Sequence, residues 1–202
     1  MLADSMQELT NQVMARLFVE LEASARHVHL TKEQALRLFG HDLTPKRPLS
    51  QPGQFLAQER VTVVGPKGEM HHVAVLGPAR KEAQVEISMT DARMLGLQPP
   101  IRESGKVAGS PGAVIRSQTG EITIDSGVII AQRHLHLTPE DAARFQVADR
   151  QIVRLQVFTQ RPLIFHDVLV RVRPDFAARA HLDFDEANAC GLQPGDLGRI
   201  LP

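Results

Sequence analysis

The sequence contains no tryptophan, no tyrosine and a single cysteine, Cys190, in 202 residues. One cysteine excludes an internal disulfide and any zinc motif built from paired cysteines. Cys190 is the one thiol that could carry an acyl group, but its place in a short helix favours inert packing as a small apolar residue. The lack of Trp and Tyr argues against aromatic platforms on which nucleic-acid bases could stack.

An excess of charge of either sign is also missing, because 23 Lys and Arg residues balance 23 Asp and Glu residues. This balance argues against a nucleic acid or an anionic membrane as the main partner. The sequence has no run of eighteen apolar residues and no basic leader followed by an apolar segment. We therefore expect a soluble, intracellular protein with no nucleic-acid partner and no membrane partner.

Residues 5–21 form the first patterned segment, and Ser5 with Glu8 fits a capping box. Its apolar residues recur at the three- and four-residue steps of a helix: Met6, Leu9, Val13, Met14, Leu17, Phe18 and Leu21. In one interpretation this helix docks on its own domain, or FVELEAS forms part of the first strand instead. In the other, residues 1–22 are an amphipathic segment that docks on another protein.

The rest of the chain is typical of short strands and turns. RVTVVGPKGEMHHVAVLG and QIVRLQVFTQRPLIFHDVLVRV each predict a β-hairpin. Short helices are predicted at residues 31–39, 90–95, 138–145 and 185–190, each opening on a capping residue, and two of them stop at Gly96 and Gly191. Many short strands separated by turns predict a mainly β protein, either barrels or a sandwich.

An internal repeat organises the chain. SARHVHLTKEQALRLF matches AQRHLHLTPEDAARF, and EISMTDARMLGLQP matches HLDFDEANACGLQP. In the second pair Glu86 aligns with His181. The chain therefore reads as a duplication with a boundary near residue 130.

Each half of the repeat supplies three candidate metal ligands. The histidines of an H-x-H strand point to the same side, because side chains alternate between faces. The first half offers His27, His29 and Glu86, and the second offers three histidines: His134, His136 and His181. Imidazole and carboxylate suit zinc and similar divalent ions, and three protein ligands with an open position are typical of catalytic zinc. A duplication could bring both triads into one dinuclear site.

The same segments also read H-x-H-x3-E, which would make Glu33 and Glu140 ligands. Both glutamates lie at helix openings, where they complement the helix dipole, so we favour that role. Arg80, in a turn six residues before Glu86, is the favoured anion-binding arginine. Arg26 and Arg133 each precede an H-x-H pair and point to the other face, where a salt bridge is the favoured role.

Together these motifs resemble the phosphotransacylase family of propanediol utilisation, the phosphate propanoyltransferases. The resemblance spans about residues 23–191 and is carried by SARHVHLT, QPGQFLAQERVTVVGPKG, LGPARKEAQVEIS, SGKVAGSPG, GVIIAQRHLHLTPEDA and HLDFDEANA. It implies two β-barrel domains with short helices and two divalent metals, usually zinc. It also implies reversible transfer of a short acyl group, propanoyl or acetyl, between coenzyme A and phosphate.

Carried over by position, the resemblance implies that His27, His29 and Glu86 bind one metal, that the triad of the second half binds the other, and that Arg80 positions phosphate. The expected domains are an N-terminal segment at 1–22, a first barrel at 23–130 and a second barrel at 131–202, with strand exchange between the barrels left open. Family members commonly carry an N-terminal helix that directs encapsulation, which implies a bacterial microcompartment location and shell or core proteins as partners. A homodimer is usual in similar proteins.

The expected chemistry is direct attack of phosphate on the thioester, without an acyl-enzyme. A metal could polarise the carbonyl or hold the departing sulfur as thiolate. Two other functions are compatible with the same ligands. One is a dinuclear thioesterase, and the other is a non-catalytic, metal-dependent microcompartment protein.

Overall fold

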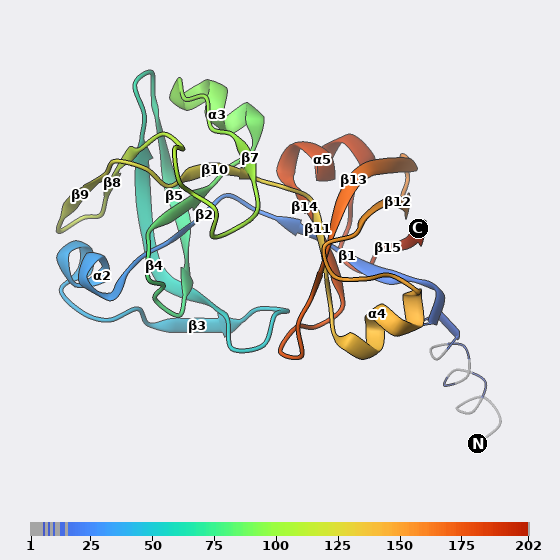
Figure 1. Ribbon diagram of the computed structural model, residues 1–202. Coiled ribbons are helices and arrows are strands. Elements are labelled where there is room, and N and C mark those ends of the chain that lie inside the picture. Colours follow the sequence, from blue (N-terminus) through green and yellow to red (C-terminus); the bar gives the residue numbers. More distant parts are fainter. Residues whose placement is uncertain (1–5, 7, 9, 11–12, 15, 202) are drawn as a thin grey trace. The chain divides into compact units, whose positions relative to one another are not determined.

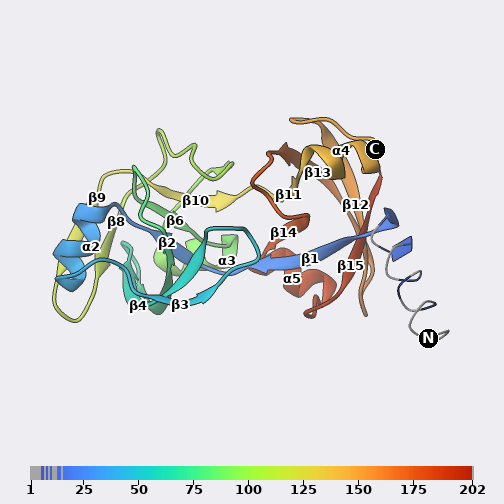
Figure 2. The ribbon, with the colours of Figure 1, turned by 90° about the horizontal axis from the view of Figure 1, so that it is seen from below.

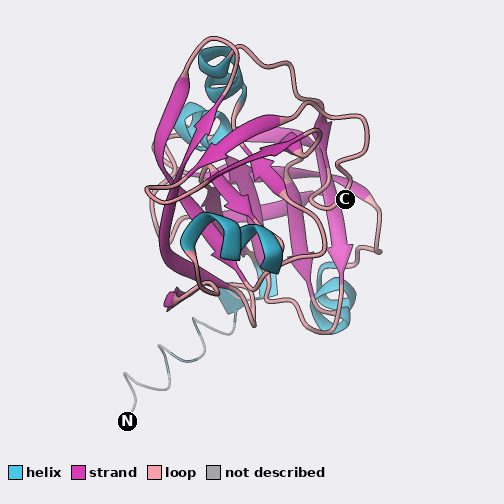
Figure 3. Ribbon diagram, turned by 90° about the vertical axis from the view of Figure 1, so that its left-hand side faces the viewer, coloured by secondary structure: helices cyan, strands magenta, loops and turns pink. Residues whose placement is uncertain are grey.

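The structure is a computed structural model that describes residues 6, 8, 10, 13–14 and 16–201 (Figure 1). Within these residues it contains fifteen strands and four short helices, so the prediction of a mainly β protein is confirmed (Figure 3). None of the described helices is long and apolar enough to cross a membrane. The described chain divides into two compact units, which are considered in turn.

One unit is a closed barrel. It takes residues up to Ser24 together with Arg133–Leu182 and 186–202. Its strands, in barrel order, are β1 (Val19–Ser24), β14 (Arg179–Asp183), β11 (His134–Leu137), β13 (Leu163–Val172), β12 (Ile152–Phe158) and β15 (Leu197–Leu201). Helix α4 (Pro139–Phe145) follows β11, and α5 (Phe184–Cys190) follows β14. Alternate residues of the strands, such as Leu135, Leu155 and Val168, fill the interior and are fully buried.

Strand β1 comes from the opposite end of the chain and pairs antiparallel with β15, Val19 lying across from Gly198 (Figure 2). The predicted helix through Leu21 is therefore wrong at its end, whereas the alternative of an extended FVELEAS is confirmed for Val19–Ser24. Val19 and Leu21 alternate into the barrel core at the two-residue step of a strand, whereas Leu21 also lies three and four residues after Phe18 and Leu17, which matched a helix. Ser5, where the helix was predicted to begin, lies outside the described residues.

The other unit consists of Ala25–Gln132 and Asp183–Asp185 and contains a nine-stranded sheet. The sheet order is β7 (Ile101–Arg102), β10 (Val128–Ala131), β6 (Gln84–Glu86), β2 (His27–His29), β5 (Glu69–Gly77), β4 (Phe55–Val64), β8 (Ala113–Arg116) and β9 (Glu121–Ile124), with β3 (Pro45–Pro48) paired to β4. Helices α2 (Lys32–Phe39) and α3 (Met89–Leu95) accompany it. One face of the sheet packs around Val28, Val63 and Val85, all fully buried.

The helix ends follow local sequence rules. Thr31 caps α2 and Thr138 caps α4, each accepting a backbone N–H three residues on, as predicted. Two predicted starts are wrong by one or two residues, because Ser88 rather than Thr90 caps α3 and because α5 begins at Phe184. Gly96 follows α3 with φ 73°, a left-handed conformation that glycine adopts without strain.

Both predicted hairpins are present, as β4–β5 and β12–β13, and both are bulged at the same place. His72 in β5 and Asp167 in β13 each have φ 56°. Each lies two residues before the partner of the first histidine of an H-x-H strand, since His27 pairs with Ala74 and His134 with Leu169. The repeat therefore extends to the backbone, because His72 and Asp167 adopt the same unusual φ at equivalent positions of the two halves.

Candidate metal centres

The first triad is assembled by two short antiparallel strands. His27 in β2 lies directly across from Glu86 in β6, and His29 lies across from Gln84. Val28, between the two histidines, points into the core and is fully buried. Strand alternation therefore turns both imidazoles and the carboxylate to the opposite face of the sheet, where they meet.

The second triad repeats this arrangement in the barrel. Strands β11 and β14 are neighbours (Figure 1), and His134 in β11 lies directly across from His181 in β14. Leu135 and Leu137 face the barrel interior, so His134 and His136 face outward. The register thus matches the sequence alignment, in which Glu86 and His181 occupy equivalent positions. All six predicted ligands are brought together as the two predicted groups.

The distances within the first triad suit a small divalent ion. His27 Nε2 lies 3.1 Å from His29 Nε2 and 3.5 Å from Glu86 Oε1, and His29 Nε2 lies 4.0 Å from the same oxygen. Tetrahedral zinc with bonds of about 2.0–2.1 Å separates its ligand atoms by about 3.4 Å. His27 Nδ1–H donates to the carbonyl oxygen of Ala25 at 2.7 Å, so Nε2 is the nitrogen that carries the lone pair once the ring is neutral, as a metal requires.

The second triad is equally compact. Its ligand atoms, like those of the first, lie within 4.8 Å of one another. The ring centroids of His134 and His181 are 5.0 Å apart, and those of His136 and His181 are 4.8 Å apart. The donor sets of both triads fit a divalent metal such as zinc, with three protein ligands in each. That these residues are ligands stays a prediction.

A polar network behind Glu86 connects it with Arg80. Gln84 Nε2 donates to Glu86 Oε1 and to Ser104 Oγ, the latter at 2.8 Å. Gly105 N–H donates to Gln84 Oε1 at 2.7 Å, and Arg80 Nη1 donates to Ser104 Oγ at 3.0 Å. Sequence reasoning missed Gln84 and Ser104. The available signal was that Gln84 lies two residues before Glu86 and so shares its face of the strand.

Electrostatics divides the first triad into an ion pair and a neutral imidazole. Burial lowers the pKa of His27, but the Glu86 carboxylate outweighs it and the pKa rises above the ordinary 6.5. Burial, with the positive charges of His27 and Arg80, lowers the pKa of His29 well below its ordinary value. Burial acts to raise the pKa of Glu86, yet His27 holds it well below the usual range. The carboxylate is therefore ionised and His29 is unprotonated at neutral pH.

An ion pair accompanies each triad, formed by the arginine that precedes the H-x-H pair and points to the opposite face of the strand. Arg26 Nη2 lies 3.0 Å from Asp91 Oδ1, and Arg133 Nη1 lies 2.6 Å from Glu186 Oε1. Arg26 and Arg133 precede the H-x-H pairs, while Asp91 and Glu186 each lie five residues after the third ligand. The salt-bridge role favoured for both arginines is therefore confirmed.

The remaining candidates lie apart from the triads. Glu33 and Glu140 are in first helical turns with exposed side chains, as predicted. Cys190 is fully buried, and burial raises the pKa of its thiol. Its Sγ donates to the carbonyl oxygen of Ala187. This environment supports the interpretation of Cys190 as an inert packing residue.

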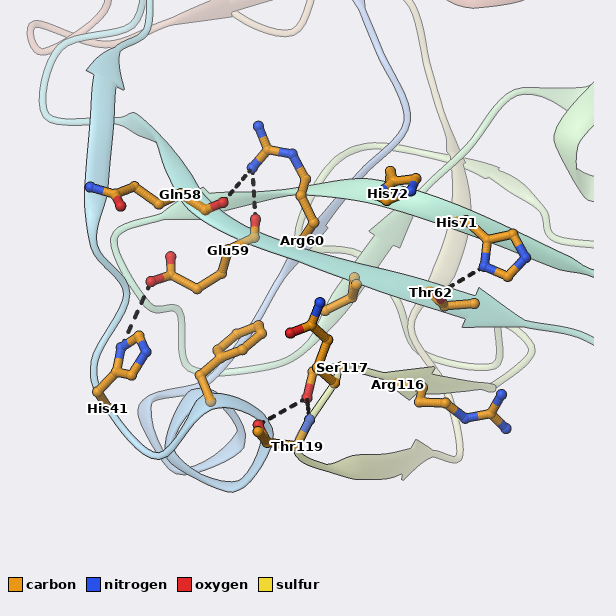
Figure 4. Close-up of a pocket in the computed structure, with 13 residues that line it drawn as sticks. His41, Gln58, Glu59, Arg60, Thr62, His71, His72, Arg116, Ser117 and Thr119 are labelled. Carbon is orange, nitrogen blue, oxygen red and sulfur yellow. Dashed lines mark hydrogen bonds and ion pairs between the residues drawn. The ribbon is translucent and has the colours of Figure 1, made fainter.

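A hollow of about 590 Å³ opens beside β4, β5 and the β8–β9 turn (Figure 4). Its lining, as far as the described residues define it, includes no triad member. Its charged side chains bind near neighbours: His41 Nδ1 lies 3.7 Å from Glu59, and Arg116 Nε lies 2.7 Å from Glu121. Arg60 donates to the carbonyl oxygens of Ala57 and Glu59, at 2.6 and 2.7 Å. These contacts occupy the side chains of His41, Arg60 and Arg116, three of the groups with which the hollow could recognise a ligand.

Comparison with known proteins points to a family. The family model described as phosphate propanoyltransferase matches residues 20–193. The chain is 50% identical over 206 residues to the phosphate propanoyltransferase of Enterococcus faecalis, which covers 98% of each chain. It is 49% identical to the phosphate propanoyltransferase of Listeria monocytogenes, covering 96% of this chain and 92% of that relative. The phosphate propanoyltransferase of Thermotoga maritima is 54% identical, with 88% of this chain and 86% of the relative covered.

Proposed function

Because this chain belongs to the phosphate propanoyltransferase family and is thus an acyltransferase, we propose that it moves a short acyl group reversibly between coenzyme A and inorganic phosphate. Propanoyl is the first candidate, with acetyl as an alternative. The observation that supports this function most directly is the pair of triads, built at the same register on two copies of one strand motif.

The triads are proposed to hold two divalent ions, with zinc as the first candidate. His27, His29 and Glu86 would hold one, and the three histidines of the barrel would hold the other. Bound there, the ions would supply Lewis acidity for the thioester carbonyl and positive charge for phosphate or a leaving thiolate. The compact donor sets support this assignment.

Arg80 is the proposed phosphate-positioning residue of the first triad. Its guanidinium is fixed through Ser104, which also binds Gln84, the hydrogen-bond partner of Glu86. A planar fork of N–H donors orients a phosphate oxygen toward the carbonyl. That oxygen forms the new C–O bond as the C–S bond breaks, and the sulfur leaves with the electron pair as coenzyme A thiolate.

The transfer is proposed to be direct, with no acyl group on the protein. The one thiol, Cys190, is fully buried and its pKa is raised by burial, so it is neither exposed nor ionised. Ping-pong kinetics, or a propanoyl group trapped on Cys190, would contradict the direct mechanism.

The decisive experiment is release of coenzyme A from propanoyl-coenzyme A by the full chain, with and without inorganic phosphate, before and after chelation. We expect release that requires phosphate, yields acyl phosphate and disappears with the metals. Release without phosphate would identify the thioesterase instead. Metal binding without release would identify a non-catalytic microcompartment protein.

The N-terminal segment is proposed to direct the enzyme into a bacterial microcompartment. Apolar side chains of its described residues face solvent, with Met6 65%, Val13 45% and Leu17 50% exposed. Phe18 packs edge-to-face on Phe158 of the barrel at 5.4 Å, so the segment is anchored where β1 begins. A chain lacking residues 1–17 should keep its activity and lose co-purification with shell proteins. Unchanged co-purification would refute the targeting role.

A further inference from the structure

Ser104 lies at the centre of the polar network beside the first triad. Its Oγ accepts one hydrogen bond from Arg80 Nη1 at 3.0 Å and another from Gln84 Nε2 at 2.8 Å. A serine hydroxyl has two lone pairs and one proton, so these two bonds leave its own O–H to be donated. The acceptor is Glu86: burial acts to raise the pKa of that carboxyl, and a hydrogen bond with Ser104 is among the contacts that lower it. One hydroxyl therefore contacts both the proposed phosphate-positioning arginine and a proposed metal ligand.

The orientation of the Gln84 amide fixes the direction of these hydrogen bonds. Gln84 is 2% exposed, and its Oε1 accepts from Gly105 N–H at 2.7 Å. Because a backbone N–H can only donate, the amide oxygen must face Gly105 and the amide nitrogen must face Ser104 and Glu86. The two N–H groups of that nitrogen are then used, one for Glu86 Oε1 and one for Ser104 Oγ. Ser104 is therefore an acceptor toward Gln84, which leaves its proton for the carboxylate.

The residues that Ser104 connects belong to separate segments of the chain. Glu86 ends β6, whereas Arg80 lies in the turn after β5, where its backbone N–H donates to the carbonyl oxygen of Leu30 at 2.8 Å. Ser104 itself comes from a third segment, the loop that follows β7. A shift of the guanidinium or of the carboxylate changes a hydrogen bond of the same hydroxyl. The position of each group therefore depends on that of the other.

We propose that Ser104 is a positioning residue that couples phosphate binding at Arg80 to metal binding at the first triad. This inference rests on the proposed phosphotransacylase function. A metal that fixes Glu86 also fixes the Ser104 hydroxyl and, through it, the guanidinium that binds phosphate. Phosphate on Arg80 fixes the carboxylate in return, and the two effects on affinity are equal because binding free energies are linked reciprocally. Phosphate therefore helps the first triad to retain its metal.

Ser110, six residues further along the same loop, provides a matched control. Its Oγ donates to the carbonyl oxygen of Val107 at 2.7 Å and accepts from Gly127 N–H at 2.9 Å. This hydroxyl holds the loop through main-chain groups, whereas that of Ser104 contacts side chains of the site. Removing either hydroxyl loosens the loop, so a comparison of the two separates loop anchoring from coupling.

The test uses the full chain loaded with zinc, unmodified and as Ser104→Ala, Ser104→Thr and Ser110→Ala. Zinc retention is measured by competition with a graded chelator, with and without inorganic phosphate at matched ionic strength, and His181→Ala identifies which step of release belongs to the first triad. We expect phosphate to raise zinc affinity at the first triad about threefold or more, and Ser104→Ala to lose most of this gain. Ser104→Ala should also raise the KM for phosphate about tenfold, while the KM for acyl-coenzyme A stays within about twofold. Ser104→Thr, which keeps the hydroxyl, and Ser110→Ala should both behave as the unmodified chain does.

An equal effect of phosphate on zinc retention in Ser104→Ala and in the unmodified chain would overturn the proposal. So would the absence of any phosphate effect in the unmodified chain, or an equal loss in Ser110→Ala or Ser104→Thr. Ser104 is half-buried in a loop, so its alanine variant should fold, as circular dichroism can check. Ser104→Gly removes the same hydroxyl if alanine disturbs the fold. Failure of the proposed function is separate, because it would appear as absence of phosphate-dependent coenzyme A release in the unmodified chain, while zinc competition still reports on the coupling.

Discussion

At the scale of single residues, the two triads differ at one position, Glu86 in one and His181 in the other. This exchange determines how each is supported. The carboxylate needs hydrogen-bond donors, and Gln84 supplies one while being held by Gly105 N–H at 2.7 Å. At the aligned position the barrel has Arg179, which binds Glu20 instead. The residue two positions before the third ligand therefore differs with that ligand: a hydrogen-bond donor to the carboxylate precedes Glu86, whereas the residue before His181 has its partner elsewhere.

Replacing Gln84 by Ala should weaken one metal and spare the other. The Glu86 carboxylate loses the donor that orients it, and loss of such an outer partner typically costs about 10–100-fold in metal affinity. Zinc titration against a competing chelator should show one weakened site and one unchanged site. Gln58→Ala, at an exposed position of β4, is the matched control. Equal affinities in both variants would show that Gln84 has no role in orienting Glu86.

Metal uptake by the first triad should depend on pH. The pKa of His27 lies above 6.5 and that of Glu86 well below its usual range, so near neutrality the proton to be displaced is on His27. Affinity should therefore rise with pH until the His27 pKa is passed, and then level off. Glu86 is ionised throughout and adds no slope.

The measurement uses His181→Ala, which disables the second triad and isolates the first. Zinc calorimetry between about pH 6 and 9, in buffers of different ionisation enthalpy, counts the protons released. Release should fall toward zero at the alkaline end. A constant affinity over the whole range would contradict the His27–Glu86 ion pair.

At the scale of elements, each centre is built on two paired strands, and an ion pair joins the start of the H-x-H strand to the helix that follows the other strand. Arg133 and Glu186 join the start of β11 to α5, with side chains only 29% and 19% exposed. Arg173 and Asp175 form a pair of similar length, 2.7 Å, with both side chains 60% exposed. Because the two ion pairs have similar lengths and different exposure, comparing them isolates the effect of burial on the strength of the pair.

A double-mutant cycle on Arg133→Gln and Glu186→Gln should give a coupling energy of about 1–2 kcal/mol in the free energy of unfolding. The same cycle on Arg173 and Asp175 should give less than about 1 kcal/mol, because solvent screens an exposed pair. Urea unfolding of the full chain, followed by a probe in the barrel, measures both. Similar coupling energies for the two pairs would show that the Arg133–Glu186 ion pair stabilises the barrel no more than an exposed pair does.

Local elements and the ligands they carry could be predicted from the sequence, because their causes are local. Thr31 and Thr138 cap helices within three residues, and the two H-x-H strands follow from alternation. Glu86 and His181 were found because the repeat converts sequence alignment into strand register. Ser104 could not be found this way. It reaches the first triad through a loop contact with Gln84, which no nearby residue encodes.

At the scale of the whole molecule, the sequence left open whether FVELEAS is a helix or a strand, for a related reason. Leu21 follows Leu17 and Phe18 at helical steps, but it also follows Val19 at the two-residue step of a strand. Only pairing with β15, at the far end of the chain, decides between them.

Leu21→Ala should therefore destabilise the barrel by about 2–5 kcal/mol, because Leu21 is 3% exposed within its core. Leu17→Ala, four residues earlier and 50% exposed, should change stability by less than about 0.5 kcal/mol. Denaturant unfolding compares the two. A small effect of Leu21→Ala would mean that β1 is dispensable for the barrel.

The closure of the barrel by β1 and β15 also sets an order of events during synthesis. Residues 25–132, which form almost all of the unit with the nine-stranded sheet, leave the ribosome as one run and can fold while translation proceeds. The barrel must wait, because its strand β1 is made before this run of residues and its strand β15, Leu197–Leu201, only well after it. A chain interrupted before β15 therefore contains the first triad but cannot close the barrel that carries the second.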